Sequence, residues 1–270
     1  MMITREPLSL PPPRSELQRL GQDCLLRLVE VGRATSICFG AFAAMRYALT
    51  TRSRREIVTQ MYTGGIKSLP VVTVVAVFIG MILALQLGVE ARVYNQEVLV
   101  GSAVMAVMLR EMGPFMSGLV LAASVGAAMA AQIGTMTINE EIAALEIMSI
   151  DPLRFLVMPR MVAMVIMVPL LSFYTCMMGV LGGAVVGYTQ LSVPWRVYFQ
   201  NAMDFAANRA LYVGMLKALF FGILITTIAC YEGFATKRGA VGVGIATRRC
   251  VISCFLLILI TGYFVTRFFY

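Results

Sequence analysis

The sequence contains no histidine, and only 13% of its 270 residues carry a charge. Without histidine the chain cannot form a Ser-His-Asp triad, a His-ligated metal site or a histidine proton relay. Soluble proteins have about 25% charged residues, whereas 59% of this chain is hydrophobic. The composition therefore predicts an integral membrane protein. Carboxylate chemistry remains possible, but we expect no enzymatic activity and no catalytic residue.

Motifs that bind metals or nucleotides are also missing. The six cysteines form no C-x-x-C pair and are interpreted as small buried residues: Cys24, Cys38, Cys176, Cys230, Cys250 and Cys254. The glycines between Gly239 and Gly244 lack the G-K-[ST] ending of a phosphate-binding loop. We therefore expect no metal site and no cofactor bound by this chain, so a partner protein or an ion gradient must supply any energy.

Long uncharged runs predict an all-α membrane protein with about five transmembrane helices, because a crossing takes about 20 apolar residues. The expected spans are Leu69–Val89, Met112–Ile138, Met161–Tyr188, Leu211–Tyr231 and a short fifth, Cys250–Val265. Val98–Leu109 is apolar but too short to cross, and is expected to be a separate helix lying in or dipping into the membrane. Residues 18–49 are too charged for a confident span and favour an interfacial helix, with a crossing by residues 31–49 as the alternative. This divides the chain into a cytoplasmic or interfacial segment, 1–63, and a transmembrane domain, 64–270.

The basic residues are distributed unequally between the two sides of these spans. Sixteen Lys and Arg lie in residues 1–68, 139–160 and 232–249, against four in the intervals on the other side. Cytoplasmic loops carry the excess of Lys and Arg. The net charge of +8 therefore indicates orientation rather than nucleic-acid binding, with the N-terminus cytoplasmic and the C-terminus outside.

Two spans carry small residues at intervals of four. Such a stripe gives one helix face almost no side-chain bulk and allows close helix packing. We expect this packing role for Gly118, Gly126, Gly134, Gly179 and Gly183.

Thr137 to Pro152 predicts a short acidic helix on the cytoplasmic side, between spans two and three. Thr137 and Glu140 have capping-box spacing, and Asp151-Pro152 can cap and start the next helix. The segment is either a connector or a docking helix for a cytoplasmic partner, and its acidity among basic inner loops favours docking. The residues expected to couple this cytoplasmic partner to the membrane spans are Glu140, Glu141, Leu145, Glu146, Met148 and Asp151.

Three charged residues lie in or beside apolar runs. Arg110 and Glu111 precede Gly113-Pro114, a pair that can break a helix and free backbone groups. Adjacent residues project in different directions, so at least one needs another partner, such as Lys217 or a ligand headgroup. The alternatives are that Arg110 and Glu111 mark the outer end of span two and that Lys217 snorkels to an interface.

Several ordered motifs resemble the MlaE permease family, also called YrbE-type, from about Gly64 to the C-terminus. The matching stretches are LREMGP at 109–114, GTM at 134–136, EIAALEIM at 141–148, IDPL at 150–153, VMPR at 157–160 and GVGIATRR at 242–249. The resemblance implies a permease subunit of a lipid ABC transporter in the bacterial inner membrane, with Asn139–Ile150 as coupling helix and Arg110 and Glu111 in an outer lipid pocket. Lys217 is assigned to the same lipid site. The family usually has Arg and Glu where this chain has Ser124 and Gln132, a compensated loss that leaves gating and substrate details open.

The partners implied by this resemblance are a second permease copy, a cytoplasmic ABC ATPase dimer that uses the ATP, a periplasmic MCE-domain lipid-binding protein, often a small STAS-domain protein, and phospholipid. We therefore interpret the chain as a permease that moves phospholipid or a related lipid between inner and outer membranes. The alternatives are an ion-coupled secondary transporter of a small amphipathic solute and a non-transporting envelope scaffold. An ion-coupled transporter would be expected to show inverted repeats, which the sequence lacks.

Overall fold

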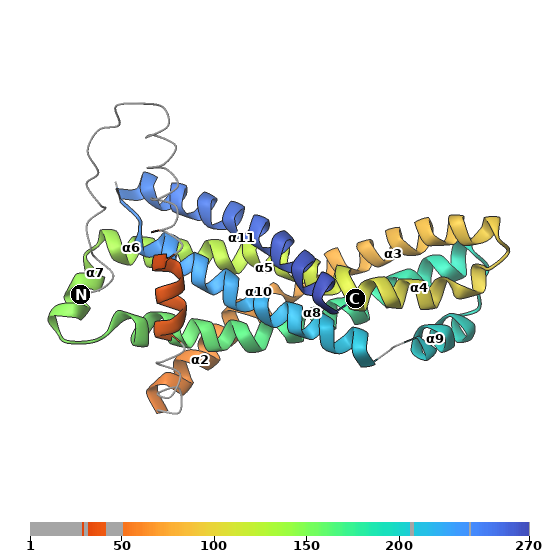
Figure 1. The fold of residues 1–270 in the computed structure, drawn as a ribbon, viewed down its shortest axis with the longest axis horizontal. Coiled ribbons are helices and arrows are strands. Elements are labelled where there is room, and N and C mark those ends of the chain that lie inside the picture. Colours follow the sequence, from red (N-terminus) through yellow and green to blue (C-terminus); the bar gives the residue numbers. More distant parts are fainter. Residues whose placement is uncertain (1–28, 30–31, 42–50, 206–207, 238, 270) are drawn as a thin grey trace.

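The computed structural model describes residues 29, 32–41, 51–205, 208–237 and 239–269, and every regular element among them is helical (Figure 1). Five helical stretches are long and apolar enough to cross a membrane, which confirms the predicted all-α membrane protein. Residues 32–41 are helical, but most of the predicted interfacial helix over 18–49 lies outside the described residues.

The elements follow one another along the chain with short connections. Their bounds are α2 Thr51–Gly64, η2 Ile66–Ser68, α3 Leu69–Val93, η3 Glu97–Leu99, α4 Val100–Val107, η4 Met108–Met112, α5 Gly113–Leu121, η5 Ala122–Gly126, α6 Ala127–Ile138, α7 Glu141–Ile147, η6 Leu153–Val157, α8 Met158–Gln190, α9 Trp195–Asp204, α10 Asn208–Phe234 and α11 Gly239–Phe269. The elements η4, η5 and η6 are π-helical turns.

Elements η3 to α6 form one uninterrupted helical rod of 42 residues, Glu97–Ile138. At about 1.5 Å per residue the rod is roughly 63 Å long, about twice the hydrocarbon thickness of a bilayer. The prediction of a separate short helix over Val98–Leu109, broken at Gly113-Pro114, is therefore wrong. Pro114 lies at the start of α5 directly after the π turn, where the wider turn accommodates the proline ring without ending the helix.

The fifth span also begins earlier than the sequence indicated. Helix α11 starts at Gly239, a residue with a φ of 66° that forms the turn after α10, whereas the expected start was Cys250. Gly242, Ala246 and Cys250 are buried along one face of α11, while Arg248 and Arg249 are exposed on another. Because this helix is only partly surrounded by protein, it carries two charges without ending.

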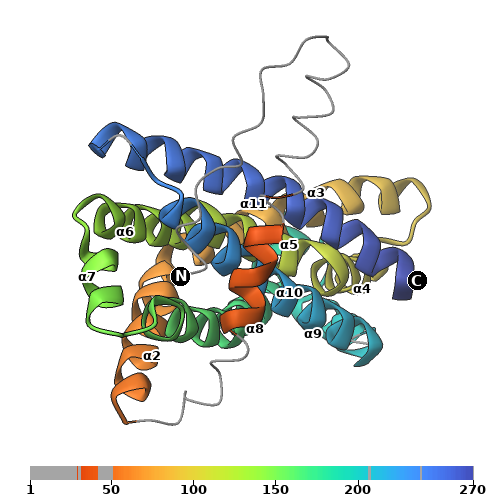
Figure 2. The same ribbon diagram turned by 60° about the vertical axis from the view of Figure 1, so that its left-hand side comes forward.

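Helix α8 lies at the centre of the molecule and packs against α3, α5 and α10. The views in Figures 1 and 2 place α7 and α9 at opposite ends of the bundle, which we call the α7 end and the α9 end. One buried core lies between α3, α4, α8 and α9. A second lies between α5, α6, α10 and α11, and a third closes the α7 end.

The glycine stripes lie where helices come closest. A Cβ atom built on Gly118 or Gly126 would lie 3.1 Å from Phe221 or Ile225 of α10, and one on Gly134 would lie 2.8 Å from Thr236. On α8, Gly179 receives the side chain of Met108, and a Cβ on Gly183 would lie 2.5 Å from the Tyr198 hydroxyl. All five glycines with a predicted packing role therefore face a neighbouring element.

The closest approach of two helices is tighter still and predicts a stability difference. A Cβ on Gly80 of α3 would lie 1.8 Å from the carbonyl oxygen of Gly179, so Gly80→Ala forces two backbones apart. We expect a loss of about 1 to 3 kcal/mol in the free energy of unfolding, the usual cost of overpacking. The measurement is thermal unfolding of the purified protein in detergent.

Gly244→Ala is the matched control, because a Cβ on Gly244 meets no described atom within 4 Å. Alanine is the better helix former, so this variant should hold or slightly raise the melting temperature. Equal shifts in the two variants would contradict the close packing of α3 on α8.

Candidate functional site: a buried charge cluster and an exposed end

The π turn Met108–Met112 places Arg110 and Glu111 about one third of the way along the 42-residue rod. In an α-helix the carbonyl of Arg110 would accept a hydrogen bond from the backbone nitrogen of residue 114. That residue is proline, which has no N–H to donate. The carbonyl oxygen of Arg110 is therefore available to accept a hydrogen bond from a side-chain donor.

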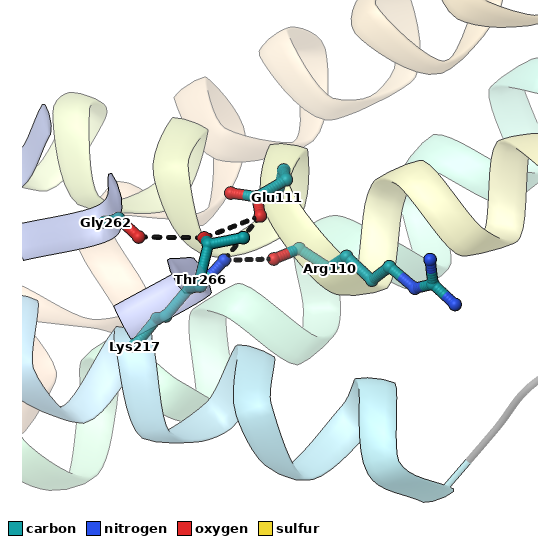
Figure 3. A network of polar contacts seen from close by, with 5 residues as sticks. All are labelled: Arg110, Glu111, Lys217, Gly262 and Thr266. Atoms are coloured by element: carbon teal, nitrogen blue, oxygen red, sulfur yellow. Dashed lines mark hydrogen bonds and ion pairs between the residues drawn. The ribbon is translucent and has the colours of Figure 1, made fainter. Parts of the chain in front are cut away.

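Lys217 of α10 supplies this donor. Its ammonium nitrogen lies 2.8 Å from the Arg110 carbonyl oxygen and 2.7 Å from Oε1 of Glu111 (Figure 3). Thr266 of α11 reaches the same carboxylate, with its hydroxyl 2.9 Å from Oε1 of Glu111 and 2.8 Å from the Gly262 carbonyl oxygen. These groups, which we call the Glu111 cluster, join three of the five long helical stretches at one depth.

The burial of the cluster is uneven. The side chain of Lys217 is 1% exposed, whereas that of Glu111 is 41% exposed, and the second carboxylate oxygen of Glu111 points away from Lys217 and Thr266 (Figure 3). A buried ammonium group is tolerated only when acceptors replace its hydration, and here a carboxylate and a carbonyl do so. Lys217 therefore does not snorkel to an interface, because its charge is matched inside the protein.

The side chain of Arg110 extends away from the cluster (Figure 3). Its guanidinium carbon lies 5.9 Å from the ring centroid of Phe205, just after α9, in a cation–π contact. The structure thus brings Glu111 and Lys217 together and leaves the Arg110 guanidinium outside their contact. The sequence analysis missed Thr266, whose only signal is a hydroxyl one helical turn after Gly262 in an apolar run.

At the α7 end, the predicted capping box is wrong. The Thr137 hydroxyl lies 2.8 Å from the Ile133 carbonyl oxygen and 3.1 Å from that of Gly233, not at the start of α7. Glu140 has a φ of 59°, a left-handed conformation that turns the chain sharply between α6 and α7. The turn shortens the helix to Glu141–Ile147, compared with the expected Asn139–Ile150.

The short helix α7 has a buried and an exposed side. Ile142 is buried and Leu145 packs partly against the same core, while Glu146 is half-buried. The carboxylate of Asp151 accepts a hydrogen bond from the Leu153 nitrogen at 3.0 Å and so caps the next helix, as the sequence predicted.

The exposed side, which we call the α7 surface, consists of Glu140, Glu141, Ile147 and Met148. Ile147 is 85% exposed and Met148 61% exposed, so an apolar tip lies beside two carboxylates. The sequence analysis did not single out Ile147, which is the most exposed residue of this tip. In the part of the chain that the structure describes, no three His, Cys, Asp or Glu side chains are placed to hold a metal ion.

Comparisons with known proteins agree with this geometry. The family model for the permease MlaE matches residues 57–268. A probable ABC transporter permease protein of Rickettsia prowazekii is 36% identical over 214 residues, which cover 79% of this chain and 83% of the relative. The intermembrane phospholipid transport system permease protein MlaE of Haemophilus influenzae is 32% identical over 250 residues, covering 90% and 93%. A probable ABC transporter permease protein of Synechocystis is 31% identical over 79% of this chain and 81% of the relative.

The match extends over most of the chain and includes both the charge cluster and the α7 end. The protein, a multi-pass membrane protein with five apolar helices, belongs to the MlaE permease family.

Proposed function

We propose that the chain is the permease subunit of an ABC transporter that moves phospholipid between the inner and outer membranes of a bacterium. The observation that carries the proposal is the Glu111 cluster, in which an ion pair between the buried Lys217 and the partly exposed Glu111 joins three spans beside Arg110, whose side chain extends toward Phe205. The membership of the chain in a permease family supports this function. The relative in Haemophilus influenzae is named for phospholipid transport.

In this proposal Arg110 and Glu111 have different tasks. The guanidinium of Arg110 is planar and always charged, and can bind a phosphate group through two parallel hydrogen bonds. Glu111 and Lys217 hold the π turn from which Arg110 projects. They therefore position Arg110, the residue that would bind the lipid headgroup. The cavity for the lipid would open toward the α9 end, between this chain and a second copy.

The α7 surface is the proposed docking site for a cytoplasmic ABC ATPase dimer, which would hydrolyse the ATP. Helix α7 is joined to α6 by the turn at Glu140 and to η6 and α8 by residues 148–152. Ile142 anchors α7 in the core, so force applied to its exposed side would move α6 and α8 as rigid rods. A periplasmic MCE-domain protein at the α9 end, and a STAS-domain protein inside, complete the proposed assembly.

We propose the orientation that the basic residues indicate, with the α7 end and the N-terminus in the cytoplasm. Single cysteines at Ala144 of α7 and at Tyr94, in the exposed turn after α3, lie at opposite ends of the bundle. In a cysteine-free background, a membrane-impermeant maleimide should label position 94 in intact spheroplasts, and position 144 only after permeabilisation. Labelling of position 144 in intact spheroplasts would overturn this orientation.

Separate variants test the proposed division of tasks at the charge cluster. Arg110→Gln should lower both co-purified phospholipid and transport, and should change the melting temperature little, because it removes the guanidinium and its cation–π contact with Phe205 but leaves the Glu111–Lys217 pair in place. Lys217→Met should lower the free energy of unfolding by about 1 to 3 kcal/mol, the value of hydrogen bonds to charged groups. Thermal unfolding, lipid mass spectrometry and a transport assay on the reconstituted complex measure the three quantities.

The double variant Lys217→Met, Glu111→Gln is the control for the cluster, because it removes both charges together and should recover part of the stability lost by Lys217→Met. Normal lipid occupancy and transport in Arg110→Gln would refute the headgroup role of Arg110.

Charge reversal tests the docking surface. Glu140→Lys with Glu141→Lys should weaken association of the ATPase subunit roughly tenfold, the equivalent of about 1.4 kcal/mol, because the acidic side of a complementary interface is inverted. Glu90→Lys, an exposed change at the α9 end, is the control and should leave association unchanged. Co-purification and binding of the ATPase to reconstituted permease give the readout, and equal association in both variants would make α7 a mere connector.

A further inference from the structure

A cavity of about 670 Å³ lies at the α7 end, far from the Glu111 cluster along the bundle. Its walls come from α2, from the end of α6, from the turn after α7, from η6 and from the first residues of α8. The titratable side chains that line it are Glu56, Asp151, Arg154 and Arg160. Of these four, only Asp151 belongs to the segment proposed for coupling. The proposed transport mechanism does not use Glu56, Arg154 or Arg160.

Arg160 is the unusual member of this lining. The residue is 6% exposed, so its guanidinium is almost wholly removed from water. Its one hydrogen bond in the described structure is a long one, 3.4 Å from Nη2 to Oε1 of Gln132. Its Nε and Nη1 atoms are buried and have no hydrogen-bond partner among the described residues. Arginine stays charged in proteins, so two donors and a positive charge are left unmatched beside a cavity.

Neither acidic residue of the cavity forms an ion pair with Arg160 among the described residues. Glu56 accepts a hydrogen bond from Gln60 of the same helix at 2.9 Å, and Asp151 caps the Leu153 nitrogen. Arg160 takes part in neither the Arg92–Glu97 nor the Lys217–Glu111 ion pair. Gln132, its hydrogen-bond partner, is neutral. An uncompensated buried charge costs several kcal/mol, and an anionic ligand would remove that cost.

The surroundings of Gln132 extend the polar layer. Gln132 also lines a second cavity of about 220 Å³, together with Lys67, Ser68, Thr63 and Ser124. The ammonium group of Lys67 lies above the Tyr62 ring, 5.8 Å from its centroid. Gln132 therefore lines the smaller cavity and contacts Arg160, which lines the larger one, and each cavity has at least one basic residue in its lining.

The depth of this layer matches a lipid headgroup. Arg160 is the third residue of α8, and no charged residue follows it before the end of that helix at Gln190. Gln132 precedes the end of α6 by six residues, or roughly 9 Å at about 1.5 Å per residue. The unmatched charge therefore lies where a polar interval meets an apolar span, which is the level of the lipid phosphates.

We propose that Arg160 forms a binding site for the phosphate group of a phospholipid in the leaflet at the α7 end. The phosphate would accept hydrogen bonds from the unmatched guanidinium donors of Arg160. Free phosphate offers the same chemistry, but the position at the edge of the apolar span favours the lipid. The site is separate from Arg110 and does not depend on the proposed transport activity.

Photocrosslinking from the cavity wall tests the proposal. A photoreactive amino acid replaces Met136, which lines the larger cavity, and the delipidated full chain in detergent receives phosphatidylglycerol or diacylglycerol with identical acyl chains. We expect at least a tenfold preference for the phosphatidylglycerol adduct, because only that lipid carries a phosphate. The same probe at Phe78, on the exposed apolar face of α3, is the control and should capture both lipids equally.

Gln132→Glu is the decisive variant. A carboxylate placed beside Arg160 should neutralise its charge, hold or raise the melting temperature, and reduce the phosphatidylglycerol adduct to the diacylglycerol level. Gln190→Glu, the same change at the exposed far end of α8, should leave the adduct unchanged. Arg110→Gln should also leave the Met136 adduct unchanged, which separates this site from the proposed transport route.

A further measurement distinguishes a phospholipid from free phosphate as the ligand of the Arg160 site. If millimolar inorganic phosphate raises the melting temperature of the natural protein but not of Gln132→Glu, and no lipid adduct forms, the same site takes free phosphate. An adduct that is equal for both lipids and insensitive to Gln132→Glu, without stabilisation by inorganic phosphate, would overturn the proposal.

Discussion

The ammonium group of Lys217 is buried in the middle of α10, and its two acceptors come from a single π turn of the neighbouring rod. One acceptor is the Glu111 carboxylate and the other is the Arg110 carbonyl, which Pro114 leaves without its usual backbone donor. Thr266 brings α11 to the same carboxylate. Three spans are therefore held in register by one charge, because separating them would leave an ammonium group without hydration or partner.

The same π turn gives the arginine its direction. Adjacent residues on a helix point to different sides, so a turn that aims Glu111 at Lys217 aims Arg110 toward Phe205 and the α9 end. A structural charge and a charge that can bind a ligand are thus carried by neighbouring residues. Gly179 of α8 receives the side chain of Met108, the first residue of the π turn, so α8 packs closely against this turn.

The bundle holds buried charge differently near its middle and near its α7 end. Near its middle, the buried Lys217 is paired with a carboxylate, whereas near the α7 end the buried Arg160 has only the neutral Gln132. A paired charge fixes helices, and an unmatched charge beside a cavity attracts an anion. Together with the exposed carboxylates of α7, this gives the α7 end a polar layer around its cavities and an exposed acidic surface.

The sequence alone determined that the chain is a bundle of about five apolar helices, because uncharged runs of membrane length leave the backbone no other way to satisfy its hydrogen bonds. It also identified Arg110, Glu111 and Lys217 as unusual, since charges in apolar runs are costly. Only the tertiary structure decided which of them pair, that Pro114 continues a helix through a π turn, and that α7 begins at a left-handed Glu140. These features depend on contacts between residues about 100 positions apart, such as Glu111 with Lys217, and on backbone turns that have no periodic signal in the sequence.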